Sequence, residues 1–293
     1  MQGRLTRKLA AATLVLFCTT CPVLARSVTQ PGDTMGSPSG APIPPGVYVA
    51  NQANWGCSNT TPRTCVGTEI PLFAWSTPWK PLGGRLAFAT APTTWVDVDF
   101  HHADSFSGLF NPFVGAELAW NLGHGWGFAY LLGAYFDIDS PVVAYDSTSL
   151  NQRFGLSYTG NGWDLTANVI WGIQFDQVTS NPTPSPCPIP LGFPSRGCNP
   201  NFLNVDLTAT KKFGKWELGP IGFYATDVST PVPEYLRQSK AAIGGLVGYW
   251  AGPFVLQVYG TTEFYEENYG GKDTRLWSRL VIPLGGQPAR PIP

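Results

Sequence analysis

Apolar and polar residues alternate along most of the chain in runs of about ten. In "WDLTANVIWGIQF" (163–175) every odd position is apolar, whereas the even positions include Asp164, Asn168 and Gln174. The run "NFLNVDLTATKKF" (201–213) repeats the pattern. Successive side chains of a β-strand point to opposite faces, so each run predicts a strand with one apolar and one polar face.

The order of strands and connectors predicts the fold class. We expect twelve strands, at about 46–56, 69–79, 85–100, 113–122, 126–138, 152–160, 162–175, 201–213, 216–228, 239–250, 253–266 and 273–284. The connectors alternate between long (57–68 first) and short ("PLGG", 81–84, first). An even number of antiparallel strands with this alternation is typical of an outer-membrane barrel, whose short turns face the periplasm and whose long loops face outward. The sequence therefore predicts an all-β, antiparallel transmembrane β-barrel of about 12 strands.

The stretch "AWNLGHGWGFAYLLGAYFDI" (119–138) tests this interpretation, because it is long enough for a membrane-spanning helix. Its glycines and the central "GHG" instead favour two strands joined by a tight turn. Pro92 and Pro220 fall inside other predicted strands. Neither can donate a ladder hydrogen bond, so each predicts a bulge or a kink.

A secreted sandwich with a packed core would show the same alternation, and it stays the alternative fold. Strand lengths near the roughly 9–11 residues that cross a bilayer favour the barrel. Composition points the same way, because only 13% of residues are charged, against about 25% in soluble domains. Aromatic residues also recur near strand ends, as interfacial girdles require: Trp126, Phe213, Trp216, Trp250 and Phe254.

The two ends of the chain are expected to lie outside the barrel. Residues 1–25 have a basic start, an apolar core and a small-residue cleavage site, which together predict a secretory signal peptide. Residues 26–45 are rich in Pro, Gly and Ser and predict a flexible periplasmic leader. The barrel is then 46–284 and the C-terminal tail 285–293. Cleavage removes three basic residues and no acid, so the mature chain is acidic and gives no reason to expect nucleic-acid binding.

Four cysteines remain after the signal. Their even number in an exported chain predicts disulfides, which proximity pairs as Cys57–Cys65 and Cys187–Cys198, both in outer loops. A zinc site is the competing interpretation, but no histidine is near either pair.

The polar faces of the predicted strands define a lumen. Charges of both signs there would create a transverse field that orients a solute, or they would fill a narrow barrel with ion pairs. Both interpretations stay open. The expected lumen and substrate-path residues are Asp97, Asp99, Glu117, Asp164, Asn168, Gln174, Asn204, Asp206, Gln257, Glu263, Arg275 and Arg279.

The sequence contains few signs of catalysis or of metal binding. There is no phosphate-binding loop, zinc-protease helix or nucleophile elbow. His101 and His102 follow a strand with carboxylates, but adjacent histidines point to opposite faces, so we predict no metal site. His102 with Ser105 or Ser107 could be cast as a hydrolase pair, which makes an outer-membrane hydrolase the third hypothesis. We predict no catalytic residue and no cofactor.

Three motifs carry a resemblance to a known family. "GAPIPPGVYVANQANW" (40–55), "WELGPIGFYATDVS" (216–229) and "VYGTTEFYEENYGGKDTRLWSRLVIPL" (258–284) are similar to the first, late and closing strands of bacterial outer-membrane transporters of the MetA pathway of phenol degradation. Two features depart from that family. The chain continues past its last strand as "GGQPARPIP" without a terminal aromatic residue, and the cysteine-stapled loops are not characteristic of it.

The resemblance implies an outer-membrane channel for passive uptake of small, hydrophobic or aromatic compounds. The expected partners are outer-membrane lipid of a Gram-negative bacterium, the solute and the barrel assembly machinery. The alternative is a surface barrel that transports nothing and displays its cysteine-tied loops for binding or adhesion. The sequence leaves open the solute, the pore radius, the oligomeric state and whether the leader plugs the lumen.

Overall fold

The structure is a computed structural model that describes residues 27–61, 63–100, 105–138, 143–145, 147–175, 199–231 and 235–284. The predicted signal peptide (1–25) and the predicted C-terminal tail (285–293) are not among the described residues. The same holds for Cys187, Cys198, His101 and His102. The strands are β1 (Gly46–Ser58), β2 (Thr64–Ser76), β3 (Arg85–Ala91), β4 (Trp95–Phe100), β5 (Phe106–Leu109), β6 (Phe113–Gly123), β7 (Trp126–Tyr135), β8 (Ser149–Tyr158), β9 (Trp163–Gln174), β10 (Phe202–Phe213), β11 (Trp216–Asp227), β12 (Ser239–Ala251), β13 (Phe254–Glu267) and β14 (Asp273–Leu284).

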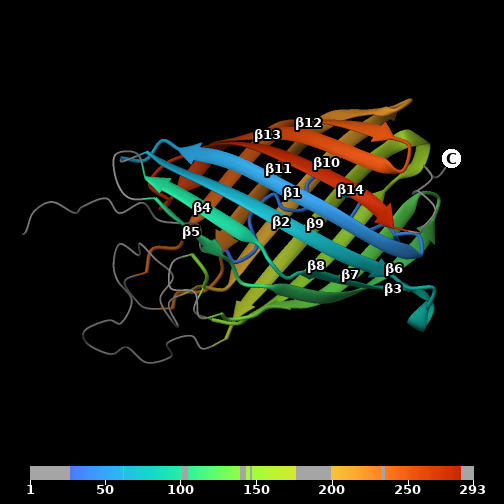
Figure 1. Cartoon of the computed structure of the whole chain (residues 1–293), viewed down its shortest axis with the longest axis horizontal. Helices are drawn as coiled ribbons and strands as arrows, with labels where there is room; N and C mark the ends of the chain where they lie inside the picture. The colour runs from blue at the N-terminus through green and yellow to red at the C-terminus, as the bar shows by residue number, and fades with distance from the viewer. Residues whose placement is uncertain are drawn as a thin grey trace, which may run out of the picture.

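These strands form one closed antiparallel barrel (Figure 1). The last strand pairs with the first, from Val47↔Leu284 to Ser58↔Asp273, so the described sheet has no free edge along β1 and β14. The segments β3 and β4 share one position in the wall, and β5 and β6 share the next. The prediction of an all-β barrel of 12 strands is therefore confirmed. No helix among the described residues has the length and apolar character that a membrane crossing needs.

The wall has a break where β2 meets β3 and β4. Phe73–Ser76 of β2 pair with β3, and Thr64–Glu69 pair with β4, but residues 70–72 have no ladder partner on this side. Four residues, 91–94, lie opposite these three, so the register shifts by one. Pro92 lies in this stretch, and a proline cannot donate to the ladder. The predicted irregularity at Pro92 is found here. At Pro220 the register opposite Gly245 of β12 is kept, but Gly219 and Pro220 have no ladder partner on β10.

The apolar stretch 119–138 forms the predicted hairpin. It contributes the end of β6, the start and body of β7, and a tight turn in which His124 has a φ of 51°. Trp126 and Leu132 are exposed on the outer face, while Gly127 and Gly133 are buried on the inner face. The alternation of side chains along β7 thus puts its apolar residues towards lipid.

Two of the predicted connectors are wrong. The connector expected between the strands 85–100 and 113–122 contains β5. The first loop was expected at 57–68, but β1 and β2 extend to Ser58 and Thr64 and leave only residues 59–63 between them. The connector 77–84 at the opposite end is longer. Cross-strand pairing of the two cysteines extends the hairpin, which local turn signals do not show. The end of the barrel that carries 77–84 also carries the tight turn at His124, and we call it the short-turn end. We call the opposite end the long-loop end.

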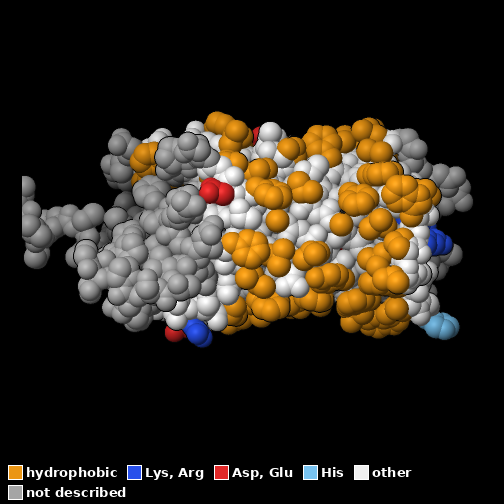
Figure 2. Space-filling model, turned by 90° about the horizontal axis from the view of Figure 1, so that it is seen from below, with side chains coloured by type: hydrophobic (Ala, Val, Ile, Leu, Met, Phe, Trp, Pro, Cys, Tyr) orange, Lys and Arg blue, Asp and Glu red, His pale blue; other side chains and the backbone are white. Residues whose placement is uncertain are grey.

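The outer surface carries a broad band of apolar side chains (Figure 2). Its members are exposed although they are large, as in Leu207, Phe213, Ile243, Leu256 and Leu276. Every strand from β1 to β14 carries at least one such exposed apolar side chain, as contact with hydrocarbon around a barrel requires.

Candidate functional site

The leader lies inside the barrel. Figure 1 shows its dark blue trace within the lumen, and Val28, Thr29 and Met35 are nearly or completely buried there. The expectation of a flexible periplasmic leader is therefore wrong for residues 27–41. That expectation was based on composition, which does not show the polar residues of the barrel wall that bind this segment. We call residues 27–41 the plug.

The wall strands β8 to β10 hold one side of the plug. The carboxylate of Asp206 accepts hydrogen bonds from the backbone N of Gly32 (2.9 Å), the backbone N of Thr34 (2.9 Å) and the Thr34 hydroxyl (2.7 Å). Asn168 donates to the same hydroxyl at 2.9 Å. Asn204 donates to the carbonyl of Thr29 at 3.0 Å. These bonds satisfy backbone groups of a segment that has no strand pairing of its own.

The opposite side of the plug is held by Arg279 of β14. Its guanidinium donates to the carbonyls of Met35 (2.7 Å) and Asp33 (2.6 Å) and to the hydroxyl of Ser37 (2.8 Å). Gln257 of β13 donates to the carbonyl of Gly36 at 2.7 Å. A buried guanidinium is costly unless its donors are used, and the plug backbone supplies acceptors for them.

Glycines on the inner wall make room for the plug. A Cβ atom at Gly155 of β8 would lie 2.4 Å from the carbonyl oxygen of Ser39, and one at Gly127 of β7 would lie 2.6 Å from that of Gly40. Gly40 in turn donates its backbone N–H to Ser157 at 2.8 Å. The backbone of the plug therefore lies directly against the wall at these positions.

The structure brings ten of the twelve expected lumen residues to the inner face. Five of them form hydrogen bonds directly with the plug: Asn168, Asn204, Asp206, Gln257 and Arg279. Asp97 and Asp99 do not face the lumen, because they share the outer face of β4 with the exposed Trp95. The one-residue shift at 91–94 reverses the alternation, so that Val96 and Val98 face inward instead. The inward set is Glu117, Asp164, Asn168, Gln174, Asn204, Asp206, Gln257, Glu263, Arg275 and Arg279.

A cavity lies above the plug, towards the long-loop end. Its empty volume is about 1580 Å³, including the part open to solvent. One wall is apolar and comes from β2, β4 and the residues around β6: Ile70, Leu72, Val96, Val98, Phe110 and Phe113. The plug supplies the floor with Val28 and Pro31. Sequence reasoning missed this wall, because it assigned the inner face of β4 to carboxylates.

The other wall of the cavity is charged but paired. Lys240 lies 3.0 Å from Glu263, and Arg275 lies 3.0 Å from Asp273. Burial raises the pKa of Tyr269, in the connector between β13 and β14, well above its usual range, so this phenol stays neutral. The positive charges of Lys240 and Arg275 are therefore neutralised by acids of the same wall.

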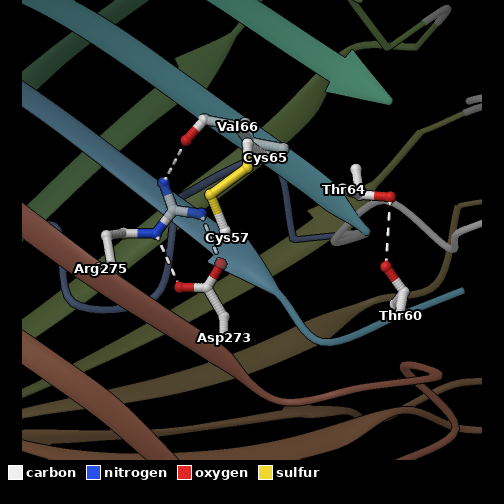
Figure 3. Close-up of a disulfide and its surroundings, with 7 residues drawn as sticks. All are labelled: Cys57, Thr60, Thr64, Cys65, Val66, Asp273 and Arg275. Carbon is white, nitrogen blue, oxygen red and sulfur yellow. Dashed lines mark hydrogen bonds and ion pairs between the residues drawn. A yellow bond between two sulfur atoms is a disulfide. The ribbon is translucent and has the colours of Figure 1, made fainter. Parts of the chain in front are cut away.

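The disulfide Cys57–Cys65 closes the top of the β1–β2 hairpin (Figure 3). The two cysteines are direct partners in the ladder, so this predicted bond joins strands and not loop tips. Beside it, Arg275 reaches across β1 and donates to the carbonyl of Val66 on β2 at 2.9 Å. A Cβ at Gly56 would lie 2.8 Å from the Arg275 side chain, so glycine permits this crossing.

The described residues offer no group of three or more metal-ligating side chains. Ser105 and Ser107, considered as hydrolase candidates, are both exposed on or beside β5. His102 lies outside the described residues.

The closed barrel, its apolar outer band and its filled polar lumen define the class of outer-membrane β-barrels. The family model described as "Putative MetA-pathway of phenol degradation" matches residues 33–280, and the chain belongs to this family. The match confirms the resemblance found in the strand motifs.

Two solved structures share the fold. The COG4313 outer membrane channel from Pseudomonas putida F1 has a TM-score of 0.61 at 14% identity, covering 87% of this chain and all of that one. The β domain of the Bordetella autotransporter BrkA has a TM-score of 0.51 at 10% identity, covering 83% of this chain and all of that one. No curated protein matches the chain in sequence.

Proposed function

We propose that this protein is an outer-membrane channel for passive uptake of small, apolar or aromatic compounds. The observation that carries the proposal is the apolar wall of the cavity. Val98 and Phe113 are largely buried by neighbouring side chains, but together with Val96 they line the space that the plug leaves unfilled, where a small apolar molecule could lie. Membership of a family named for phenol degradation and the similarity to a solved outer-membrane channel support the same proposal.

The proposed route begins at the long-loop end, which faces the medium, and continues through the cavity. Below the cavity the plug fills the lumen, so the solute reaches the periplasm when the plug moves. The plug is held by hydrogen bonds and lacks strand pairing, so it can leave without opening the barrel. The process involves no covalent chemistry.

The test is solute uptake by liposomes that contain the purified protein, with single-channel recording in planar bilayers alongside. We expect uptake of benzyl alcohol above that of empty liposomes. Val98→Asp adds a carboxylate to the apolar wall and should reduce the uptake, because desolvating that charge is costly. Asn121→Asp adds the same charge at the exposed short-turn end and should leave uptake unchanged.

Absence of both uptake and conductance in the wild-type protein would refute the channel. That outcome would favour the alternative of a barrel that displays its loops for binding or adhesion.

A further inference from the structure

On the apolar side of the cavity, the hydroxyl of Thr94 is a polar group that a ligand could bind. Thr94 lies in the wall break, is only 6% exposed and lines the cavity. Its carbonyl accepts a hydrogen bond from the backbone N of Phe110 at 2.8 Å. Within the described part of the chain, its hydroxyl has no hydrogen-bond partner. Although the residue as a whole is buried, this hydroxyl is not shut off from the cavity, so a bound molecule could supply its partner.

The residues nearest to Thr94 along the two strands make an apolar surface around it. Ala91 at the end of β3 and Val96 in β4 lie on either side of it along the chain, and Phe110 lies across the hydrogen bond. Leu72 comes from the unpaired stretch of β2 on the other side of the break. Sites for small molecules characteristically combine such an apolar lining with a few placed polar groups.

The charged wall limits what this site can accept. The cations Lys240, Arg275 and Arg153 each face an acid, at 3.0, 3.0 and 3.6 Å. A ligand carboxylate would have to displace one of these acids or remain unpaired in a space that is partly closed to water. Both alternatives are unfavourable, because a buried charge needs a partner of its own.

We propose that the cavity binds an uncharged molecule with a small aromatic or aliphatic body and one hydroxyl or carbonyl group, which forms a hydrogen bond with Thr94. The inference rests on the proposed function, because it takes the cavity to be part of the path of the solute. It adds two points: the chemical class of the solute and the residue, Thr94, that selects it.

The test is equilibrium binding to the purified full chain in detergent, measured by calorimetry with three probes of similar size. Benzyl alcohol has the hydroxyl, toluene lacks it and benzoate carries a charge. We expect benzyl alcohol to bind best and benzoate to show no binding. Thr94→Val keeps the shape of the side chain and removes its hydroxyl. It should weaken benzyl alcohol about 5- to 10-fold, the value of one neutral hydrogen bond, and leave toluene unchanged.

The matched control is Thr262→Val, which removes a hydroxyl that pairs with Thr274 away from the cavity. It should bind all three probes as the wild-type protein does. Heat-modified migration on gels checks that each variant is a folded barrel. Equal affinity for benzoate, or a Thr94→Val variant that still prefers benzyl alcohol over toluene, would overturn the inference.

The binding and uptake results can be separated. Selective binding with no uptake by liposomes would refute the channel and keep the Thr94 site. Uptake of benzyl alcohol without any effect of Thr94→Val on binding would refute the site and keep the channel.

Discussion

Thr34 donates two hydrogen bonds to the carboxylate of Asp206, from its backbone N at 2.9 Å and from its hydroxyl at 2.7 Å. The first residue belongs to the plug and the second to β10, 172 positions later in the chain. With the bond from Gly32, this carboxylate accepts three hydrogen bonds from the plug, and hydrogen bonds to a carboxylate are stronger than neutral ones.

Replacing this carboxylate should loosen the plug. Asp206→Ala removes three charge-assisted hydrogen bonds, and we expect plug docking to weaken by roughly 3 kcal/mol, about 100-fold in the population of open channels. Single-channel recording should show longer or more frequent open events. Asp97→Ala removes a carboxylate on the outer face and should behave as the wild-type protein. Identical recordings from both variants would mean that the plug does not limit conductance.

A methyl group in the wall should push the plug away. At Gly155 a Cβ would meet the Ser39 carbonyl at 2.4 Å, so Gly155→Ala should cost about 1–3 kcal/mol of plug docking through overpacking. We expect faster cleavage of the N-terminal segment by added protease. Gly245→Ala is the matched control, because a Cβ there meets nothing within 4 Å. If both variants resist protease equally, the plug tolerates displacement from β8.

The barrel could be predicted from the sequence because the alternation of apolar and polar residues and the lengths of the connectors are local signals. These signals repeat over many strands. The inner positions of Asp164, Asn204 and Arg279 followed from that alternation. The assignment failed at Asp97 and Asp99, since one extra residue in 91–94 reverses every later side chain of the segment. Pro92 marked the irregularity, but no local signal gives the number of residues that a bulge inserts.

The plug could not be predicted for a different reason. Its Pro, Gly and Ser residues have no periodicity, and they read as a flexible segment. Its order comes from hydrogen bonds to residues more than 100 positions away, such as Ser157 and Asp206. The glycines at 127 and 155 make room for a segment far away in the sequence, so no local signal relates them to the plug.

Fixing the plug in place should block transport. Thr34 and Asn168 are joined by a hydrogen bond of 2.9 Å, so the double variant Thr34→Cys with Asn168→Cys should react with a short bifunctional thiol reagent. We expect benzyl alcohol uptake by liposomes to fall to the level of empty liposomes after cross-linking. Each single-cysteine variant, treated in the same way, is the control. Unchanged uptake after complete cross-linking would indicate a path that avoids the plug, for which the wall break beside the cavity is the place to look.

Removal of the Cys57–Cys65 bond should change stability and leave permeability unchanged. The bond closes a loop of sequence separation 8, for which chain entropy predicts roughly 2.5 kcal/mol. Because it joins paired residues of β1 and β2, it does not cover the cavity. We expect Cys57→Ser with Cys65→Ser to lower the temperature of heat-modified migration while uptake stays the same. A large change in uptake would instead assign the hairpin tip a role as a lid.

The position of Ser27 has a practical consequence for anyone who labels this protein. Its side chain is 7% exposed and lines the cavity, and its hydroxyl accepts a hydrogen bond from Asn204 at 3.0 Å. An affinity tag or a fluorophore attached just before this residue would therefore start in the interior of the barrel. Such a label would compete with the solute for space or pull the plug out of the wall. Attachment beyond Leu284, at the other end of the last strand, avoids both effects.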